Sequence, residues 1–270
     1  MKIHKNNNNF TFKAGLTKSM QAEILRCDTK KIENYFARRN IESDFQNSKV
    51  VAWCSLKCLQ ILETLNKKFC LNLEYPKGIF VEDFRNLNSS QDDAMGFTNF
   101  APAFLHKNKN ILVPEKTIFF NASSINWENI DNIADECYEK NISTTNFFLE
   151  QILHEFMHVL HENNMLKKIG GTKMIKILQD LLNQEVLNEF LHKHAKSLSH
   201  ICDYAASHPL EAVACDLAKR EIASLDKETL LPVSNIFNKK PYNKKIFLTK
   251  NKDNSIEKLI RKYWNGNLLV

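Results

Sequence analysis

One five-residue stretch carries side chains that can do metal chemistry: His154, Glu155 and His158, in the order H-E-x-x-H. The apolar residues around it, over 145–168, recur at helical spacing. On a helix the two histidines lie about 40° apart in azimuth and about 6 Å apart along the axis, so both imidazoles can reach one ion. Glu155 lies beside that face, where it can take a proton from an activated water. The pattern predicts a metal site on this helix.

A catalytic zinc site needs a third protein ligand, and the chain offers three candidates. His161 is a further turn along the helix, about 10 Å from His154, which is too far for the same ion. We expect His161 to pack on the helix face or to support a ligand. Glu211 lies in the first turn of a predicted helix, although an acid there is also an ordinary helix-start feature. His208 lies on the bend just before that helix, where it can line a cleft. Glu211 is favoured.

The hydrophobic periodicity along the rest of the chain predicts an α+β protein with strands early and helices later. Helices are expected over residues 18–39, 49–69, 145–168, 173–201, 209–224 and 256–264. Strands are expected over 78–81, 116–120 and 245–248, with a candidate edge or irregular strand within 96–104 and a polar connection over 121–143. Residues 1–48 are predicted to be a polar N-terminal leader or helical extension, and residues 49–270 a catalytic domain.

On these residues the chain resembles the gluzincin metallopeptidases, in particular the lethal-factor-like branch that includes the Pro-Pro endopeptidases. In that branch an H-E-F-x-H helix supplies two ligands and the general base, and a glutamate on a later helix is the third ligand. A tyrosine seven residues before that glutamate supports the oxyanion, and an alanine three residues after it packs inside. The matching positions here are His154, Glu155, His158, Tyr204, Glu211 and Ala214.

The resemblance covers roughly residues 100–225 and implies a zincin-like fold, in which a small mixed sheet carries an active-site helix and the C-terminal half is helical. It implies Zn²⁺ held by His154, His158 and Glu211, with Glu155 as general base and Tyr204 supporting the oxyanion. It also implies an edge strand that holds an extended peptide, a role that the strand at 116–121 would take, with packing in the core as the equal alternative.

The chain departs from the branch at two positions near the site. Met157 stands where the branch often has glycine. Cys215 stands where an acid four residues past the ligand glutamate would orient a histidine, and Asp216 is turned about 140° away from Glu211 on an ideal helix. The surroundings of the zinc ligands therefore differ from those of the branch. The large receptor-binding and substrate-recognition domains of the toxin do not fit in 270 residues.

Composition narrows the remaining classes of function. No apolar run approaches the roughly 18 residues of a membrane span, and the basic N-terminal flank has no apolar stretch behind it, so we expect no signal peptide. A cytoplasmic protein, or one exported by a dedicated secretion system, fits this pattern. The seven cysteines include no C-x-x-C pair, which favours free thiols. The net charge of +6 comes almost wholly from lysine, with six arginines, so nucleic-acid binding is not favoured.

The sequence thus predicts a zinc metalloendopeptidase that hydrolyses peptide bonds in a protein or peptide substrate. Glu155 would take a proton from the attacking water and pass it to the leaving amine. One alternative is a catalytically inert protein on a zincin scaffold that acts as a binding or effector module. The six intact positions argue against that alternative, because a decayed site would lose its base or a ligand first. A lysine-rich nucleic-acid binder is the other alternative, and it has little support.

Overall fold

The computed structural model describes residues 16–72, 74–88, 94–108, 110–123, 125–225, 230 and 254–268. The strand predicted at 245–248 lies outside the described residues. Among the described residues no helix combines the length and hydropathy that a bilayer-crossing segment needs.

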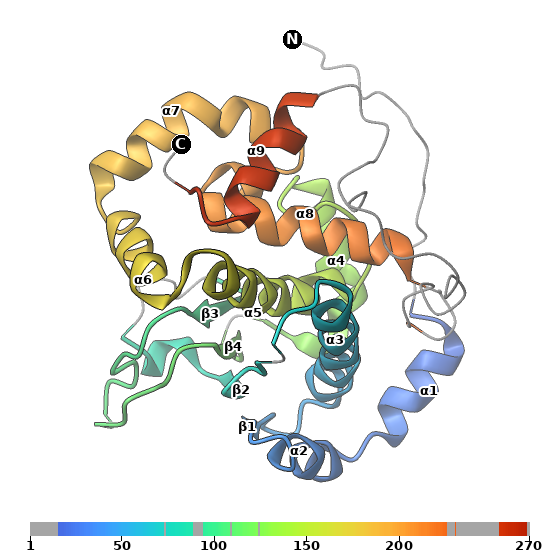
Figure 1. Cartoon of the computed structure of the whole chain (residues 1–270). Coiled ribbons are helices and arrows are strands. Elements are labelled where there is room, and N and C mark those ends of the chain that lie inside the picture. Colours follow the sequence, from blue (N-terminus) through green and yellow to red (C-terminus); the bar gives the residue numbers. More distant parts are fainter. Residues whose placement is uncertain are drawn as a thin grey trace.

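A small mixed sheet forms one layer of the α+β fold (Figure 1). Its strands are β1 (Glu42–Asp44), β2 (Gly78–Glu82), β3 (Gly96–Asn99) and β4 (Thr117–Asn121). Their order is β1-β2-β4-β3; β1, β2 and β4 are parallel, and β3 is antiparallel to β4. The strands predicted at 78–81 and 116–120 are confirmed, and the candidate within 96–104 is an edge strand of four residues.

The position of β4 corrects the prediction that residues 116–121 form the edge of the sheet. β4 pairs with β2 on one side and with β3 on the other, and all five of its residues are buried. Its apolar side chains therefore pack in the core, and β3 is the strand with an open edge in the described sheet. An unbroken run of aromatic and β-branched residues is typical of a strand that is buried on both faces, and core packing, the equal alternative in the sequence analysis, is what the structure has.

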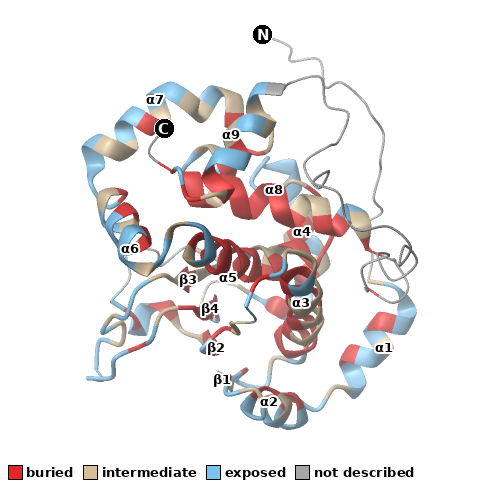
Figure 2. Ribbon diagram, viewed as in Figure 1, coloured by how far each residue is buried: buried red, intermediate tan, exposed pale blue. Residues whose placement is uncertain are grey.

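Helices pack against the sheet and against one another (Figure 1). The helices are α1 (Lys18–Arg26), α2 (Thr29–Ala37), α3 (Lys49–Lys68), α4 (Ile130–Glu139), α5 (Glu150–Ile169), α6 (Gly171–Asp180), α7 (Gln184–Leu198), α8 (Pro209–Ser224) and α9 (Asn254–Trp264). Helix α5 is central: it contacts α3 and β3 on one side and α8 and α9 on the other. Figure 2 shows that burial is concentrated in α5, α8 and the inner face of α3.

The helices predicted at 49–69, 209–224 and 256–264 are confirmed as α3, α8 and α9, whereas the other predictions need correction. Residues 18–39 form two helices, because the Asp28 side chain accepts from the Lys31 backbone N–H and starts α2 anew. Residues 173–201 also form two helices, and Asn183 caps the second by accepting from the Glu185 N–H. The connection at 121–143 contains α4, whose buried stripe was too short to stand out in the sequence.

Helix α5 begins at Glu150, five residues later than predicted. The Glu150 carboxylate accepts hydrogen bonds from the backbone N–H and hydroxyl groups of Thr144 and Thr145, which holds 144–149 in a turn before the helix. The helix ends at Gly170, whose φ of 76° suits glycine and closes the helix as predicted. These two ends fix where along the sheet the histidines of α5 lie.

The N-terminal residues are joined to the sheet. Residues 18–44 form α1, α2 and β1, and β1 pairs in parallel with β2. Met20, Ile24 and Phe36 from these helices lie in the same apolar cluster as α3 and α5. A domain boundary at residue 48 stays a prediction.

A buried lysine of the loop before β4 faces a buried glutamate of α5. Lys116 is 1% exposed, its ammonium contacts the Glu74 carboxylate, and Glu162 Oε1 lies 3.8 Å from Lys116 Nζ. Burial raises the pKa of Glu162 to about 8, because the attraction of Lys116 only partly offsets the loss of hydration. Folding therefore favours the protonated form of Glu162.

We expect Glu162→Gln to change how stability depends on pH. Between pH 5 and 8 the unfolded chain ionises Glu162 while the folded chain keeps its proton, so the stability of the wild type falls as pH rises through this window. The glutamine variant lacks this titration and should gain stability relative to the wild type from pH 5 to pH 8. Thermal unfolding at several pH values measures the difference, with the exposed Glu136→Gln as control. A constant offset between wild type and Glu162→Gln would contradict the prediction.

Candidate metal centre

Three side chains from two helices converge at the centre of the molecule: His154 and His158 of α5, and Glu211 of α8. Glu211 Oε2 lies 2.8 Å from His154 Nε2 and 3.2 Å from His158 Nε2, and the two Nε2 atoms are 3.1 Å apart. Ligand atoms of a tetrahedral zinc ion lie about 3.3 Å from one another, given metal–ligand distances near 2.0 Å. The three atoms therefore have the spacing of one face of such a tetrahedron, and among the described residues they form the group of three that can hold a metal ion.

Local structure explains why Glu211 reaches the histidines. Pro209 occupies the first turn of α8, and Glu211 follows it in that turn, pointing toward α5. Ala212, Ala214 and Ala218 are fully buried, so α8 can approach α5 closely. The inward packing of Ala214 is the placement that the resemblance implied.

The other two ligand candidates, His208 and His161, lie outside the group of three and make different contacts. His208 caps α8, where its Nδ1 accepts from the Leu210 N–H at 3.2 Å. His161 is buried, and its Nε2 lies 2.9 Å from the Tyr263 carbonyl oxygen at the end of α9, while its ring stacks on Trp264. Burial lowers the pKa of His161 to about 4, so the ring is neutral and can donate to this carbonyl. His161 thus attaches α9 to α5.

The cluster is electrostatically suited to a cation. Burial alone would raise the pKa of Glu211, but the charges and hydrogen bonds of His154 and His158 hold it well below its usual value. Burial likewise opposes protonation of His154, yet the hydrogen bond and charge of Glu211 raise its pKa to about 9. Both shifts have one cause: a buried carboxylate facing two imidazoles favours positive charge between them. A divalent ion would supply that charge.

Glu155 lies beside the three ligand atoms without being one of them. It is 5% exposed, and the Thr98 hydroxyl of β3 donates to its Oε2 at 2.8 Å. The same Thr98 oxygen lies 3.1 Å from the Glu155 backbone oxygen. Burial raises the pKa of Glu155, while the two histidines and Thr98 act in the opposite direction. A buried carboxylate with a raised pKa and a fixed orientation is what proton transfer near neutral pH requires.

Sequence reasoning missed Thr98, because its role depends on the register of β3 against β4 and on the approach of α5. Thr98 pairs with Ile118, and both face the main core. Two residues earlier, Gly96 lets the strand come close: a β-carbon there would lie 2.9 Å from the Phe119 carbonyl oxygen and 3.4 Å from Glu155 Cγ. The edge strand is thereby placed directly against the general-base candidate.

On the sequence prediction of a zinc endopeptidase, Thr98→Val is expected to lower peptide cleavage by about tenfold with little loss of zinc affinity. Valine has the shape of threonine but lacks the hydroxyl that orients Glu155, and a misoriented proton acceptor loses part of a contribution of roughly 10²–10⁴. The steady-state kcat and a zinc titration measure the two effects. Thr98→Ser keeps the hydroxyl and should retain most activity. Equal activity of the valine and serine variants would show that the hydroxyl does not matter.

Tyr204 lies next to the cluster, in a short 3-10 helix (Tyr204–Ala206) that precedes α8. Its ring centroid is 5.6 Å from that of His154, and the residue is 39% exposed. Partial burial, together with the carboxylates of Glu211 and Glu155, raises the pKa of its phenol. Tyr204 therefore stays protonated and can donate a hydrogen bond beside the cluster.

The structure shows what surrounds Met157 and Cys215, the two positions at which the sequence departs from the resembled branch. Cys215 Sγ lies 3.7 Å from His154 Nδ1, so a thiol contacts the ring where the resembled branch has an acid. Asp216 points elsewhere and forms an ion pair with Arg220. Met157 is fully buried in the main apolar cluster.

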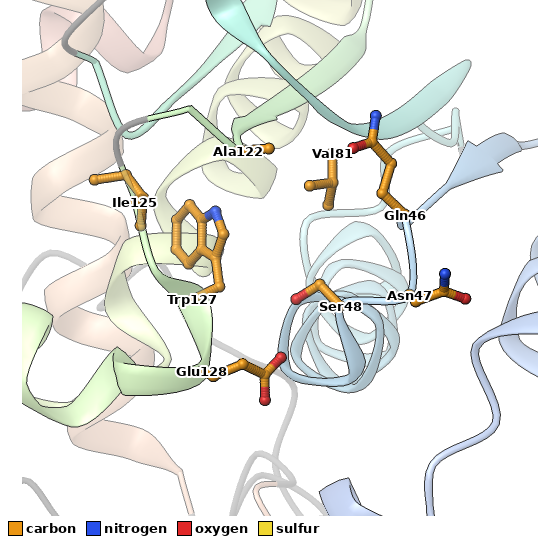
Figure 3. A pocket seen from close by; sticks show the side chains of 8 residues that line it. All are labelled: Gln46, Asn47, Ser48, Val81, Ala122, Ile125, Trp127 and Glu128. Carbon is orange, nitrogen blue, oxygen red and sulfur yellow. The ribbon is translucent and has the colours of Figure 1, made fainter.

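A pocket of about 260 Å³ opens elsewhere on the molecule (Figure 3). It lies beside the start of α3 and the carboxyl ends of β2 and β4, with Trp127 as its largest wall. Its polar side chains Gln46, Asn47 and Glu128 are exposed, and no residue of the candidate metal centre lines it. The pocket therefore adds nothing to the chemistry of the cluster.

No family model, curated protein or solved structure matches this chain. The case for a function consequently depends on the residues and their geometry.

Proposed function

We propose that the protein is a zinc-dependent endopeptidase with a zincin-like fold. The observation that supports this most is the convergence of His154, His158 and Glu211 on one point, with Glu155 held beside them. Two imidazoles and a carboxylate are a frequent protein ligand set of catalytic zinc, and they leave a fourth position for water or substrate. A purely structural zinc site would be closed by four protein ligands, and among the described residues the group has three.

In this proposal each side chain has a separate task. Zn²⁺ held by the three ligands would lower the pKa of water and polarise a carbonyl group. Glu155 accepts a proton from the attacking water and passes it to the leaving amine. Tyr204 donates a hydrogen bond to the oxyanion that develops on the substrate carbonyl. Thr98 keeps the Glu155 carboxylate in place for both proton transfers.

The placement of β3 supports a peptide as substrate. Its outer edge has no partner strand among the described residues, and its Thr98 contacts the general base. An extended peptide can add to such an edge by backbone hydrogen bonds, which would bring a peptide bond toward the cluster. In the proposal β3 takes the role that the sequence had given to residues 116–121.

Digestion of a peptide library with and without a zinc chelator tests the proposal. We expect cleavage products in mass spectra of the zinc-loaded protein, and we expect phenanthroline to abolish them and added zinc to restore them. His158→Ala, which lacks a ligand, is the control for a contaminating protease. One zinc per chain with no cleavage of any library would refute the endopeptidase and support an inert binding module on the same scaffold.

Tyr204→Phe is expected to lower kcat by about 10²-fold while zinc affinity stays within about twofold. The phenol is not a ligand in the proposal, and loss of one oxyanion donor costs about 10²–10³ in kcat. Kinetics on a cleaved library peptide and a zinc titration separate the two quantities. Tyr138→Phe, which removes an exposed hydroxyl of α4, is the control. Full activity of Tyr204→Phe would remove Tyr204 from the mechanism.

A further inference from the structure

Two buried thiols lie in contact behind the metal ligand His154. Cys202 Sγ, in the turn after α7, is 3.6 Å from Cys215 Sγ of α8. Both residues are buried, at 0% and 3% exposed, and with Ala205 they form a small cluster apart from the main core. Cys215 Sγ also lies 3.7 Å from His154 Nδ1. The pair therefore connects directly to one imidazole of the candidate metal centre.

The contact with Cys215 helps to orient the imidazole ring of His154. Nε2 of His154 faces Glu211 and His158, and Nδ1 faces the Cys215 sulfur. With a metal ion on Nε2, Nδ1 would carry the remaining ring proton and could donate it to that sulfur. Such contacts fix the ring orientation of a metal-binding histidine, and their loss typically lowers metal affinity 10- to 100-fold. A thiol can serve here, but unlike a carboxylate it can be oxidised.

We propose that Cys202 and Cys215 form a redox-active pair whose disulfide weakens the metal centre. All seven cysteines are free in the structure, so the pair is described in its reduced form. Closing a disulfide would shorten the distance between the sulfur atoms from 3.6 Å to about 2.05 Å, and it would turn the thiol that contacts His154 Nδ1 into a disulfide sulfur. Cys202 lies outside the helices, in the connection between α7 and the 3-10 helix that begins at Tyr204.

The segment between the two cysteines adds a second consequence. Residues 202–215 include Tyr204 and Glu211, so the disulfide would close a loop that carries the proposed oxyanion donor and the third ligand. Closure of this loop would constrain Tyr204 and Glu211, and it would alter the contact of Cys215 with His154. This effect on catalysis rests on the proposed function, whereas formation of the bond does not.

A hydroperoxide is the oxidant that fits a buried pair, because it is small. The Cys202 thiolate attacks one peroxide oxygen, the O–O bond breaks, and Cys202 becomes a sulfenic acid while water leaves. The Cys215 sulfur then attacks that sulfur, the S–O bond breaks, and the hydroxyl leaves with the Cys215 proton as a second water. Two thiols and one hydrogen peroxide give one disulfide and two waters. Hydrogen bonds with Cys215 and the Ala205 N–H lower the pKa of Cys202, which favours it as the attacking thiol.

Peptide mapping of the full chain after treatment with hydrogen peroxide tests the proposal. We expect mass spectra of alkylated digests to show a peptide linked through Cys202 and Cys215. We also expect zinc affinity, measured by competition with a chromophoric chelator, to fall about tenfold and to recover after reduction. Cys202→Ala, which leaves the contact of Cys215 with His154 in place, should keep its zinc affinity in peroxide; Cys202→Ser serves if the alanine variant folds poorly.

The outcomes separate this proposal from the proposed function. Peroxide-treated protein with both thiols still free, or a linked peptide with unchanged zinc affinity, would overturn the redox pair. A chain that links Cys202 to Cys215 and loses zinc affinity but cleaves no peptide would refute the endopeptidase and leave the redox pair standing. A protein that cleaves peptides in a zinc-dependent way but never links Cys202 to Cys215 would support the endopeptidase and refute the redox pair.

Discussion

Glu155→Gln is expected to bind zinc as the wild type does and to cleave peptides about 10³-fold more slowly. Glutamine has the size of glutamate and can still accept the Thr98 hydrogen bond, so the fold around β3 and α5 should be kept. It cannot accept the proton of the attacking water, and loss of a positioned base costs roughly 10²–10⁴ in rate. The loss should appear in kcat, because Glu155 acts on the reacting atoms.

Three measurements on Glu155→Gln are needed together. Zinc content and the melting temperature show that the site and the fold are intact, and kcat on a library-derived peptide shows the loss. Glu185→Gln, an exposed glutamate of α7, controls for the removal of one negative charge. A Glu155→Gln variant that keeps zinc and still cleaves at the wild-type rate would exclude the proposed mechanism, even if the metal site itself is confirmed.

The parts of the site that could be predicted from the sequence depend on local geometry. The spacing of His154 and His158 on one helix follows from 3.6 residues per turn, and Pro209 marks the start of the helix that carries Glu211. Helices α3 and α8 could be bounded within one residue, because long apolar stripes and clear ends define them. These features need no knowledge of how distant segments pack.

The parts that could not be predicted depend on contacts between distant segments. Thr98 is 57 residues from Glu155, and nothing in its local sequence marks the contact. Cys215 was recognised as a departure, but its meeting with Cys202 depends on the turn after α7. Pro102 indicated an edge or irregular strand within 96–104, but the sequence did not indicate that this strand lies next to β4, which is central because β2 and β3 both pair with it. Strand order is a property of the assembled sheet.

Glu211→Gln is expected to weaken zinc binding by at least about 100-fold, which corresponds to about 2.7 kcal/mol. The carboxylate is the only negative ligand of the three, and an amide oxygen in its place carries no charge to offset that of the ion. Loss of a side chain that only supports a ligand typically lowers metal affinity 10- to 100-fold. Loss of a ligand itself should reach or exceed the upper end of that range. Peptide cleavage at limiting zinc should fall in proportion, and excess zinc should restore part of it.

His208→Ala is the matched control, because it changes the other candidate ligand of the same segment. His208 caps α8 through Nδ1, so its loss should cost about 1 kcal/mol of stability and leave zinc affinity within about twofold. Competition with a chromophoric chelator measures the affinity, and thermal unfolding measures the stability. Should Glu211→Gln retain zinc while His208→Ala loses it, the ion would be held by a different set of side chains, and the convergence of α5 and α8 would no longer support a catalytic centre.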